Sequence, residues 1–194
     1  MDSMYHDGQR QLQDQFDTRR LADRLQEKLV KSALNPKQKA FIESADMFFL
    51  ATADEHGHPS CSYRGGDPGF VRVLDDMQTL ALPNYDGDGM YISWGNVVAN
   101  PHVGLLFIDF MKGWRLRIHG EANISRDDPL MSEYPESQFI VKIKVREAFG
   151  NCPRYIHKYQ LVERSTYVPR RDCVTPIPDW KKQPDIQDVL PRSS

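Results

Sequence analysis

MFFLATADEHGHPSCSYRG, residues 47–65, contains two runs of strand-forming residues separated by His56 and Gly57. Two such runs around a short glycine turn predict a β-hairpin. Strands that are joined by a hairpin pair in the antiparallel direction. This stretch therefore indicates a sheet that is built from sequential antiparallel strands.

The sequence that follows repeats this pattern. Residues 70–74 and 78–82 are strand-like runs around a turn at 75–76, and residues 138–150 alternate between apolar and polar side chains. Such alternation is typical of strands with one face in a core and the other face exposed. A second hairpin and a later strand are therefore predicted.

Two further strands are predicted between these segments. Residues 102–110, HVGLLFIDF, are almost continuously apolar, which predicts a strand buried on both faces. Residues 114–125 alternate, so that Arg115 and Arg117 lie on the face opposite the apolar residues. Because the apolar face must point into the core, the two arginines face outward, toward solvent, a partner subunit or an anionic ligand.

Helices are predicted at the start of the chain and as short insertions. Residues 10–33 show the spacing of a helix that lies on a surface or on a partner subunit. The apolar stripe consists of Leu12, Phe16, Leu21, Leu25 and Leu29. A second helix is predicted over 36–45, with Asn35 as its cap and Pro36 at its first position. Short helices or turns are predicted at 96–101, 127–135 and 152–159.

These elements together predict a mainly β fold. Six to seven strands in hairpin order, with helices at the start and as small insertions, favour an antiparallel β-barrel with peripheral helices. We expect a helical extension over 1–45 and the barrel over 46–168. The tail over 169–194 is expected to pack on the barrel or on a partner.

The composition limits the classes of function. The chain has 194 residues, 40% of them hydrophobic, which suits one domain with a core. The net charge of -2 gives no reason to expect a nucleic acid or an anionic membrane as partner. The polar start and the lack of a long apolar run favour a cytoplasmic protein without a secretory signal or a membrane span.

The cysteines and histidines do not identify a reactive centre. Three widely spaced cysteines indicate neither a disulfide framework nor a zinc site, and the histidines lack metal-binding spacing, so we expect no metal. Cys152 precedes a predicted helical turn, where a thiolate would be favoured. No histidine or acid suggests a triad with it, so we expect a structural role for Cys152 and assign no catalytic residue.

The loop NYDGDGMYISWG allows three interpretations. The spacing of Asn84, Asp86, Asp88 and Gly89 matches the opening of an EF-hand calcium loop, but Gly95 stands where a bidentate Glu is required. Asn, Asp and Gly also favour an ordinary surface turn. In the third interpretation, backbone N–H groups converge on an anion beside a helix that begins near Gly95. We expect Asp86 and Asp88 to point away, toward solvent or backbone donors of the turn.

The end of the predicted hairpin is a further candidate for anion binding. Arg64 is followed by Gly65 and Gly66, which places a guanidinium beside backbone that carries no side chains. Arginine binds phosphate through its planar fork, although an exposed strand end would have the same sequence. The tryptophans could stack on a planar ligand, but packing in a core or an interface is their commoner role. They are Trp94, Trp114 and Trp180.

Four segments, in this order, resemble the pyridoxamine 5'-phosphate oxidase-like flavin-binding proteins. They are FFLATADEHGHPSCSYRGG, VLDDMQTLALPNYDGDGMY, NPHVGLLFIDF and WRLRIHGEANI, and NCPRYIHK extends the match toward the C-terminus. The resemblance implies a split β-barrel, a homodimer, and FMN bound in clefts between the two subunits.

The resemblance also implies which residues hold the flavin. The strand after Pro59 would run beside the isoalloxazine ring and the ribityl phosphate, and the segment 84–94 would be a second phosphate-binding stretch. Polar residues of the strand that begins at Trp114 would reach the ring. The implied FMN-binding residues are Ser60, Ser62, Tyr63, Arg64, Gly65, Asn84, Tyr85, Gly89, Met90, Tyr91, Ser93, Trp94, Arg115 and Arg117.

The chain departs from the oxidase itself on the substrate side. The oxidase has Arg-x-Val-Leu-Leu-Lys after the hairpin, where this chain has SYRGGD, and the tail lacks the oxidase's Trp and Arg-Leu-x-x-Arg segment. This indicates a divergent branch that keeps the flavin and acts on a different, unknown small molecule. We expect an FMN-dependent oxidoreductase. The alternatives are a non-catalytic flavin-binding or carrier protein and a split-barrel dimer with a vacant site.

Overall fold

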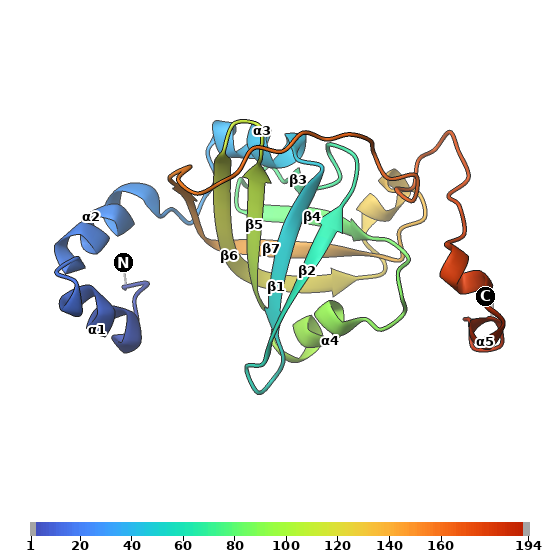
Figure 1. Cartoon of the computed structure of the whole chain (residues 1–194), viewed down its shortest axis with the longest axis horizontal. Coiled ribbons are helices and arrows are strands. Elements are labelled where there is room, and N and C mark those ends of the chain that lie inside the picture. The colour runs from blue at the N-terminus through green and yellow to red at the C-terminus, as the bar shows by residue number, and fades with distance from the viewer. Residues whose placement is uncertain (1–2, 192–194) are drawn as a thin grey trace.

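Seven antiparallel strands form one curved sheet at the centre of the structure, a computed structural model that describes residues 3–191. The strands lie in the order β2-β1-β5-β6-β7-β4-β3, so the sheet ends at β2 and β3 and does not close (Figure 1). Their bounds are β1 Met47–Ala53, β2 Pro59–Gly65, β3 Arg72–Val73, β4 Thr79–Asn84, β5 His102–Asp109, β6 Trp114–Ser125 and β7 Phe139–Asn151. The predicted mainly β, split-barrel fold is confirmed.

The first hairpin forms as its sequence predicts. β1 pairs with β2 from Met47 opposite Gly65 to Ala53 opposite Pro59. Gly57 has a φ of 85°, a left-handed conformation that glycine adopts without steric cost. β1 also pairs with β5, so this hairpin connects the edge of the sheet to its centre.

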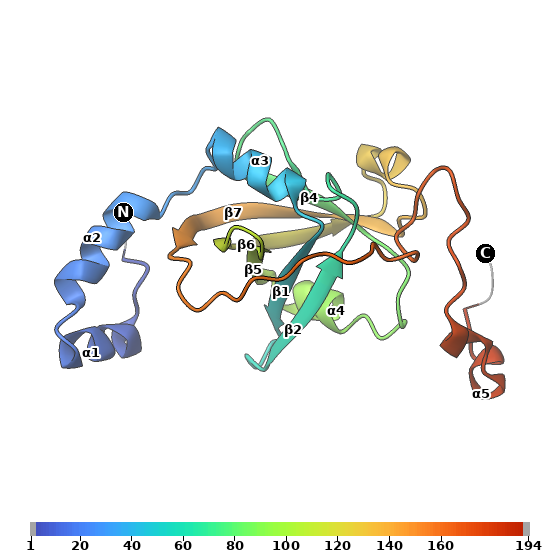
Figure 2. The same ribbon diagram turned by 45° about the horizontal axis from the view of Figure 1, so that its top comes forward.

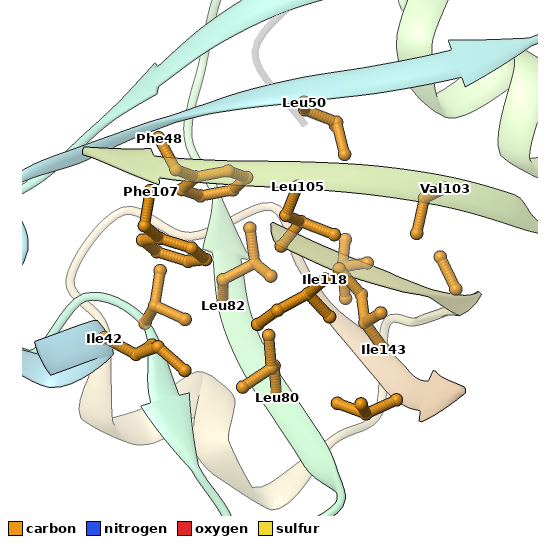
Figure 3. Packing of buried hydrophobic residues seen from close by; sticks show 14 of the residues in the cluster. Ile42, Phe48, Leu50, Leu80, Leu82, Val103, Leu105, Phe107, Ile118 and Ile143 are labelled. Carbon is orange, nitrogen blue, oxygen red and sulfur yellow. The ribbon is translucent and has the colours of Figure 1, made fainter. Parts of the chain in front are cut away.

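The core lies inside the curved sheet, where side chains from opposite parts of the sheet meet (Figure 3). Phe48 stacks on Phe107 with ring centroids 5.0 Å apart. The prediction that 102–110 is buried on both faces is wrong, because Leu105 and Phe107 point into the core whereas Leu106 lies half-buried on the outer face. The outer face of β5 is only partly covered, which leaves room for another surface.

The apolar stripe predicted as one helix over residues 10–33 belongs to two helices. α1 spans Asp7–Gln15 and α2 spans Arg19–Leu29, and Asp17 between them has a left-handed φ of 50°. Arg10 of α1 pairs with Asp23 of α2 at 2.7 Å, and the hydroxyl of Tyr5, just before α1, donates to the Ala22 carbonyl of α2 at 3.1 Å. Neither helix has a buried residue, and both project from one side of the sheet (Figure 1).

The helices in the middle of the chain lie close to the sheet. α3, Pro36–Ser44, confirms the predicted second helix, because the Asn35 side chain accepts the Gln38 N–H and Ile42 reaches the core. α4, Ile92–Ala99, lies against β1 and β2 at the opposite end of the sheet (Figure 2). A 3-10 helix, η1, spans Pro129–Glu133 in the predicted position.

After β7 the chain is extended. The predicted helical turn at 152–159 is only a single turn, in which the Ile156 N–H donates to the Pro153 carbonyl. The segment that follows crosses the molecule and ends in η2, Asp179–Lys182, and α5, Pro184–Gln187 (Figure 2). Over the described residues, 3–191, the structure contains no helix of the length and apolarity that a membrane span requires.

Candidate functional site

A pocket of about 340 Å³ lies between β2, the loop after β4 and the start of α4. Ten of the fourteen predicted site residues line it. They are Ser60, Ser62, Tyr63, Arg64, Asn84, Tyr85, Gly89, Tyr91, Ser93 and Trp94. The hairpin end and the loop that follows β4 are far apart in sequence, and the fold brings them to one place.

Arg64 supplies the positive charge of this pocket. Its guanidinium carbon lies 4.6 Å from the centre of the Trp94 ring, and its buried Nε has no hydrogen-bond partner among the described residues. Burial lowers the pKa of Arg64, and the nearby charge of Asp88 acts in the opposite direction. A desolvated guanidinium with an unpaired donor is a favourable partner for an anion.

The start of α4 adds backbone donors beside Arg64. The predicted start near Gly95 is wrong: the helix begins at Ile92, because Tyr91 turns the chain with a left-handed φ of 50°. Its first N–H groups, up to Trp94, donate to no group of the described part of the chain. Open N–H groups and the helix dipole together favour a bound anion.

A buried hydrogen-bond chain fixes the wall of the pocket. The Trp94 indole N–H donates to Asn84 Oδ1 at 2.5 Å, and Asn84 Nδ2 donates to Gln138 Oε1 at 2.8 Å. The hydroxyl of Tyr91 donates to the same Gln138 oxygen at 3.1 Å. Across the pocket, Ser62 Oγ lies 3.2 Å from Ser93 Oγ. These bonds connect β2, β4 and α4, so that the pocket has a defined shape.

The two aspartates of the loop have different partners. Asp88 Oδ1 accepts the Met90 N–H at 2.9 Å, which confirms the expected bond to a donor of the turn. Asp86 pairs instead with Lys181 of the C-terminal tail, a partner that the sequence did not indicate. Their carboxylates therefore do not act together as the calcium-loop spacing would require.

The pyridoxamine 5'-phosphate oxidase family model matches residues 34–165, which include the whole sheet and the pocket. The chain belongs to this family. The resemblance seen in the sequence is thereby confirmed. No curated protein matches the chain.

Solved structures are similar to this chain at low sequence identity. HupZ from Group A Streptococcus is 18% identical with a TM-score of 0.49, covering 66% of this chain and 99% of that one. HutZ, the heme storage protein from Vibrio cholerae, is 18% identical with a TM-score of 0.43, covering 60% and 94%. The FAD binding protein from Mycobacterium smegmatis is 15% identical with a TM-score of 0.42, covering 62% and 97%. At TM-scores below 0.5, these likenesses carry no argument about a ligand.

In this member of the family, four predicted site residues lie away from the pocket. Gly65 lies at the end of β2, where an added Cβ would approach the Tyr63 ring to 2.8 Å. Met90 is exposed in the loop before α4. Arg115 and Arg117 lie on β6, and pairing across β5 and β1 places Arg117 three strands from Tyr63, roughly 14 Å away. One chain does not bring these arginines to the pocket.

Sequence reasoning missed several residues of the pocket. The pocket is also lined by Gln138, which immediately precedes β7, and by Cys61, Gly87, Asp88 and Ile92. Gln138 lies 54 residues after its partner Asn84, so only the pairing of β4 with β7 reveals it. Cys61 lies between Ser60 and Ser62 of β2, so the hairpin sequence already placed it beside two predicted site residues.

Two other features lie outside the pocket. A groove of about 1080 Å³ runs beneath the extended segment 159–168, where Asp67 binds Arg170 through bonds of 2.7 and 2.9 Å. Cys152, for which a structural role is predicted, is exposed. A hydrogen bond from Arg154 lowers the pKa of the Cys152 thiol. The groove shares Tyr63 and Tyr85 with the pocket between β2 and α4, whereas Cys152 does not line that pocket.

Proposed function

We propose that this chain binds FMN, with the phosphate between Arg64 and the start of α4, and that it is a flavin-dependent oxidoreductase acting on a small molecule. The observation that carries the proposal is the buried Arg64 guanidinium, whose Nε has no partner within residues 3–191, beside the open N–H groups of α4. Family membership supports a flavin as the ligand.

The pocket residues fit a phosphate. A phosphate would accept hydrogen bonds from Arg64 and from the N–H groups of Ser93 and Trp94, whose helix dipole favours negative charge. The hydroxyls of Ser62 and Ser93 could donate to the phosphate or to the ribityl chain. Gly89, with a left-handed φ of 76°, allows the loop to bend around this site.

The ring of the flavin would lie toward Tyr63. The Tyr63 side chain is 63% exposed and meets Phe49 edge to face at 6.2 Å, which leaves an aromatic surface free beside the pocket. A bound flavin supplies the redox chemistry through its ring, and the protein supplies orientation and hydrogen bonds. Since no pocket residue is placed as an evident general base, transfer of a hydride or electrons suits this site.

A second copy of the chain would complete this arrangement. Arg115 and Arg117 face outward on β6, and the buried Nε of Arg115 has no partner among the described residues. Leu106 and Ile108 lie half-buried on the same outer face of the sheet. We infer a homodimer in which this face meets its symmetry mate and the arginines of one subunit approach the flavin of the other.

Titration of the purified full chain with FMN tests the proposal. Binding should quench flavin fluorescence and give protein with the absorption of oxidised flavin. Bleaching of that absorption by NADH or NADPH, followed by turnover with an acceptor, would support the oxidoreductase. Binding without turnover would favour the non-catalytic flavin-binding alternative, and a chain that takes up no FMN would overturn both.

A further inference from the structure

The loop that forms one wall of the anion pocket contains a carboxylate that an anionic ligand would oppose. Asp86 lies between Tyr85 and Gly87, both of which line the pocket, and Asp86 itself lines the adjoining groove next to Tyr85. Its side chain is 61% exposed. A phosphate group carries between one and two negative charges near pH 7, so an uncompensated carboxylate in this loop would weaken its binding.

The C-terminal tail provides the compensating charge. Lys181, 95 residues later in the chain, pairs its Nζ with Asp86 Oδ2. The Lys181 side chain is only 15% exposed, and its Nζ lies 5.4 Å from the centre of the Trp180 ring. Gln187 Nε2 donates to the Lys181 carbonyl at 2.6 Å. The lysine is therefore held at this place by contacts with its own helix η2 and with α5.

Further bonds hold the tail near the pocket. Arg171 donates to the carbonyls of Ser132 and Glu133 at 3.1 and 3.2 Å, and Thr175 Oγ1 donates to Glu136 at 2.9 Å. The carbonyls and Glu136 that these bonds reach lie in the segment between β6 and β7, which also contains Gln138, the residue before β7. The tail and the pocket wall thus share one supporting segment.

We propose that Lys181 is a positioning residue of the anion pocket. It neutralises Asp86 and turns its carboxylate away from the pocket toward the tail, so that the loop can accept a phosphate-bearing ligand. This inference rests on the proposed function. Asp88, the second acid of the loop, lines the pocket itself, but it accepts the Met90 N–H and its charge acts on nearby Arg64, so it does not depend on the tail.

The inference predicts a difference between two flavins. FMN carries the phosphate and riboflavin does not, so the charge of Asp86 matters for FMN alone. In full-length Lys181→Ala, the Kd for FMN should rise about fivefold at low salt, because a like charge near the surface is exposed to the phosphate. The Kd for riboflavin should not change. The loss should shrink at high salt, because ions screen exposed charges.

A double-mutant cycle separates neutralisation from direct contact. Asp86→Asn in the Lys181→Ala background should restore FMN binding, because the charge that Lys181 compensates is gone. Lys182→Ala is the matched control, since Lys182 pairs with Asp179 in the same segment at 2.8 Å and should bind FMN like the unchanged chain. Urea unfolding of each variant verifies that the fold is retained.

The outcomes are distinct. If Lys181→Ala weakens FMN and riboflavin equally, the lysine supports the fold rather than the charge balance, and the inference is wrong. If Asp86→Asn fails to restore FMN binding, Lys181 touches the ligand itself and the neutralising role is also wrong. If the proposed function itself is wrong, the unchanged chain will bind neither FMN nor riboflavin.

Discussion

The Arg64 guanidinium lies 4.6 Å from the centre of the Trp94 ring, and the Trp94 indole N–H is bound to Asn84 Oδ1. Trp94 therefore contacts both the Arg64 side chain of β2 and Asn84 at the end of β4, and it forms the pocket wall between them. A guanidinium over an indole face is attracted by the ring's electrons. The position of the charge in the pocket thus depends on the hydrogen bond that fixes the indole.

Trp94→Phe tests this dependence. The ring would remain available to Arg64, but the buried Asn84 oxygen would lose its donor, at a cost of about 1–3 kcal/mol in the free energy of unfolding. Urea unfolding measures this loss. Trp180→Phe is the control, because Trp180 lies in the tail and is 39% exposed. Equal effects of the two changes would show that the indole bond contributes nothing specific.

Gly120→Ala should destabilise the sheet at its bulge. An added Cβ would lie 2.4 Å from the Lys144 carbonyl oxygen of the neighbouring strand, where the register shifts after His119. Because backbone cannot move aside cheaply, we expect a loss of about 1–3 kcal/mol. Gly95→Ala adds the same methyl group in α4 with nothing within 4 Å, and should be neutral or stabilising. Thermal unfolding of both variants compares them.

Local sequence patterns were sufficient to predict much of the fold. The turn at Gly57 determined the first hairpin, and Asn35 with Pro36 determined the start of α3. The start of α4 was misplaced because Tyr91, whose left-handed conformation begins the helix, carries no turn signal of its own. A single helix was expected where Asp17 separates two, although Thr18, the N-cap of α2, is a residue type that favours this position.

The site was predictable only where its parts are local. The strand after Pro59 and the loop after Asn84 both reach the pocket as expected. The bond of Asn84 to Gln138 and the pairing of Asp86 with Lys181 join residues that no spacing connects. Such contacts follow from strand order and from the path of the tail, which single-sequence periodicity does not report.

The stability of the chain should fall at low pH partly through Asp128. Burial would raise the pKa of this carboxyl, but the bond from Lys142, with 2.6 Å between Nζ and Oδ2, and the Leu130 N–H outweigh it, and the pKa is lowered. A carboxyl whose pKa is lowered on folding stabilises the fold above its unfolded pKa of about 4, and this contribution is lost as the pH falls below that value.

Asp128→Asn measures the contribution of this negative charge alone, because the amide oxygen of Asn can still accept the Leu130 N–H. We expect the variant to lose about 1–3 kcal/mol at pH 7, and we expect the difference from the unchanged chain to shrink between about pH 4 and pH 2. Urea unfolding at several pH values measures it. Asp75→Asn, which removes an exposed carboxylate, should show no such dependence. A constant difference across this range would refute the role of the ion pair.

The N-terminal stripe and the core should respond differently to truncation. Leu25 of α2 is 43% exposed and Leu82 of β4 is 1% exposed. In dilute protein, Leu25→Ala should change the free energy of unfolding by less than about 0.5 kcal/mol, whereas Leu82→Ala should cost about 2–5 kcal/mol. A large, concentration-dependent loss in Leu25→Ala would mean that the stripe is buried against a second copy.

The measurement that tests the account most directly compares FMN and riboflavin in Arg64→Ala. One charge-assisted contact with a phosphate contributes about 1.5–3 kcal/mol, so the Kd for FMN should rise at least about tenfold. Riboflavin should bind as before, and Arg146→Ala, which removes an exposed arginine of β7, should alter neither affinity. If Arg64→Ala weakens both flavins equally while the fold is retained, Arg64 does not hold the phosphate and the proposed site is wrong.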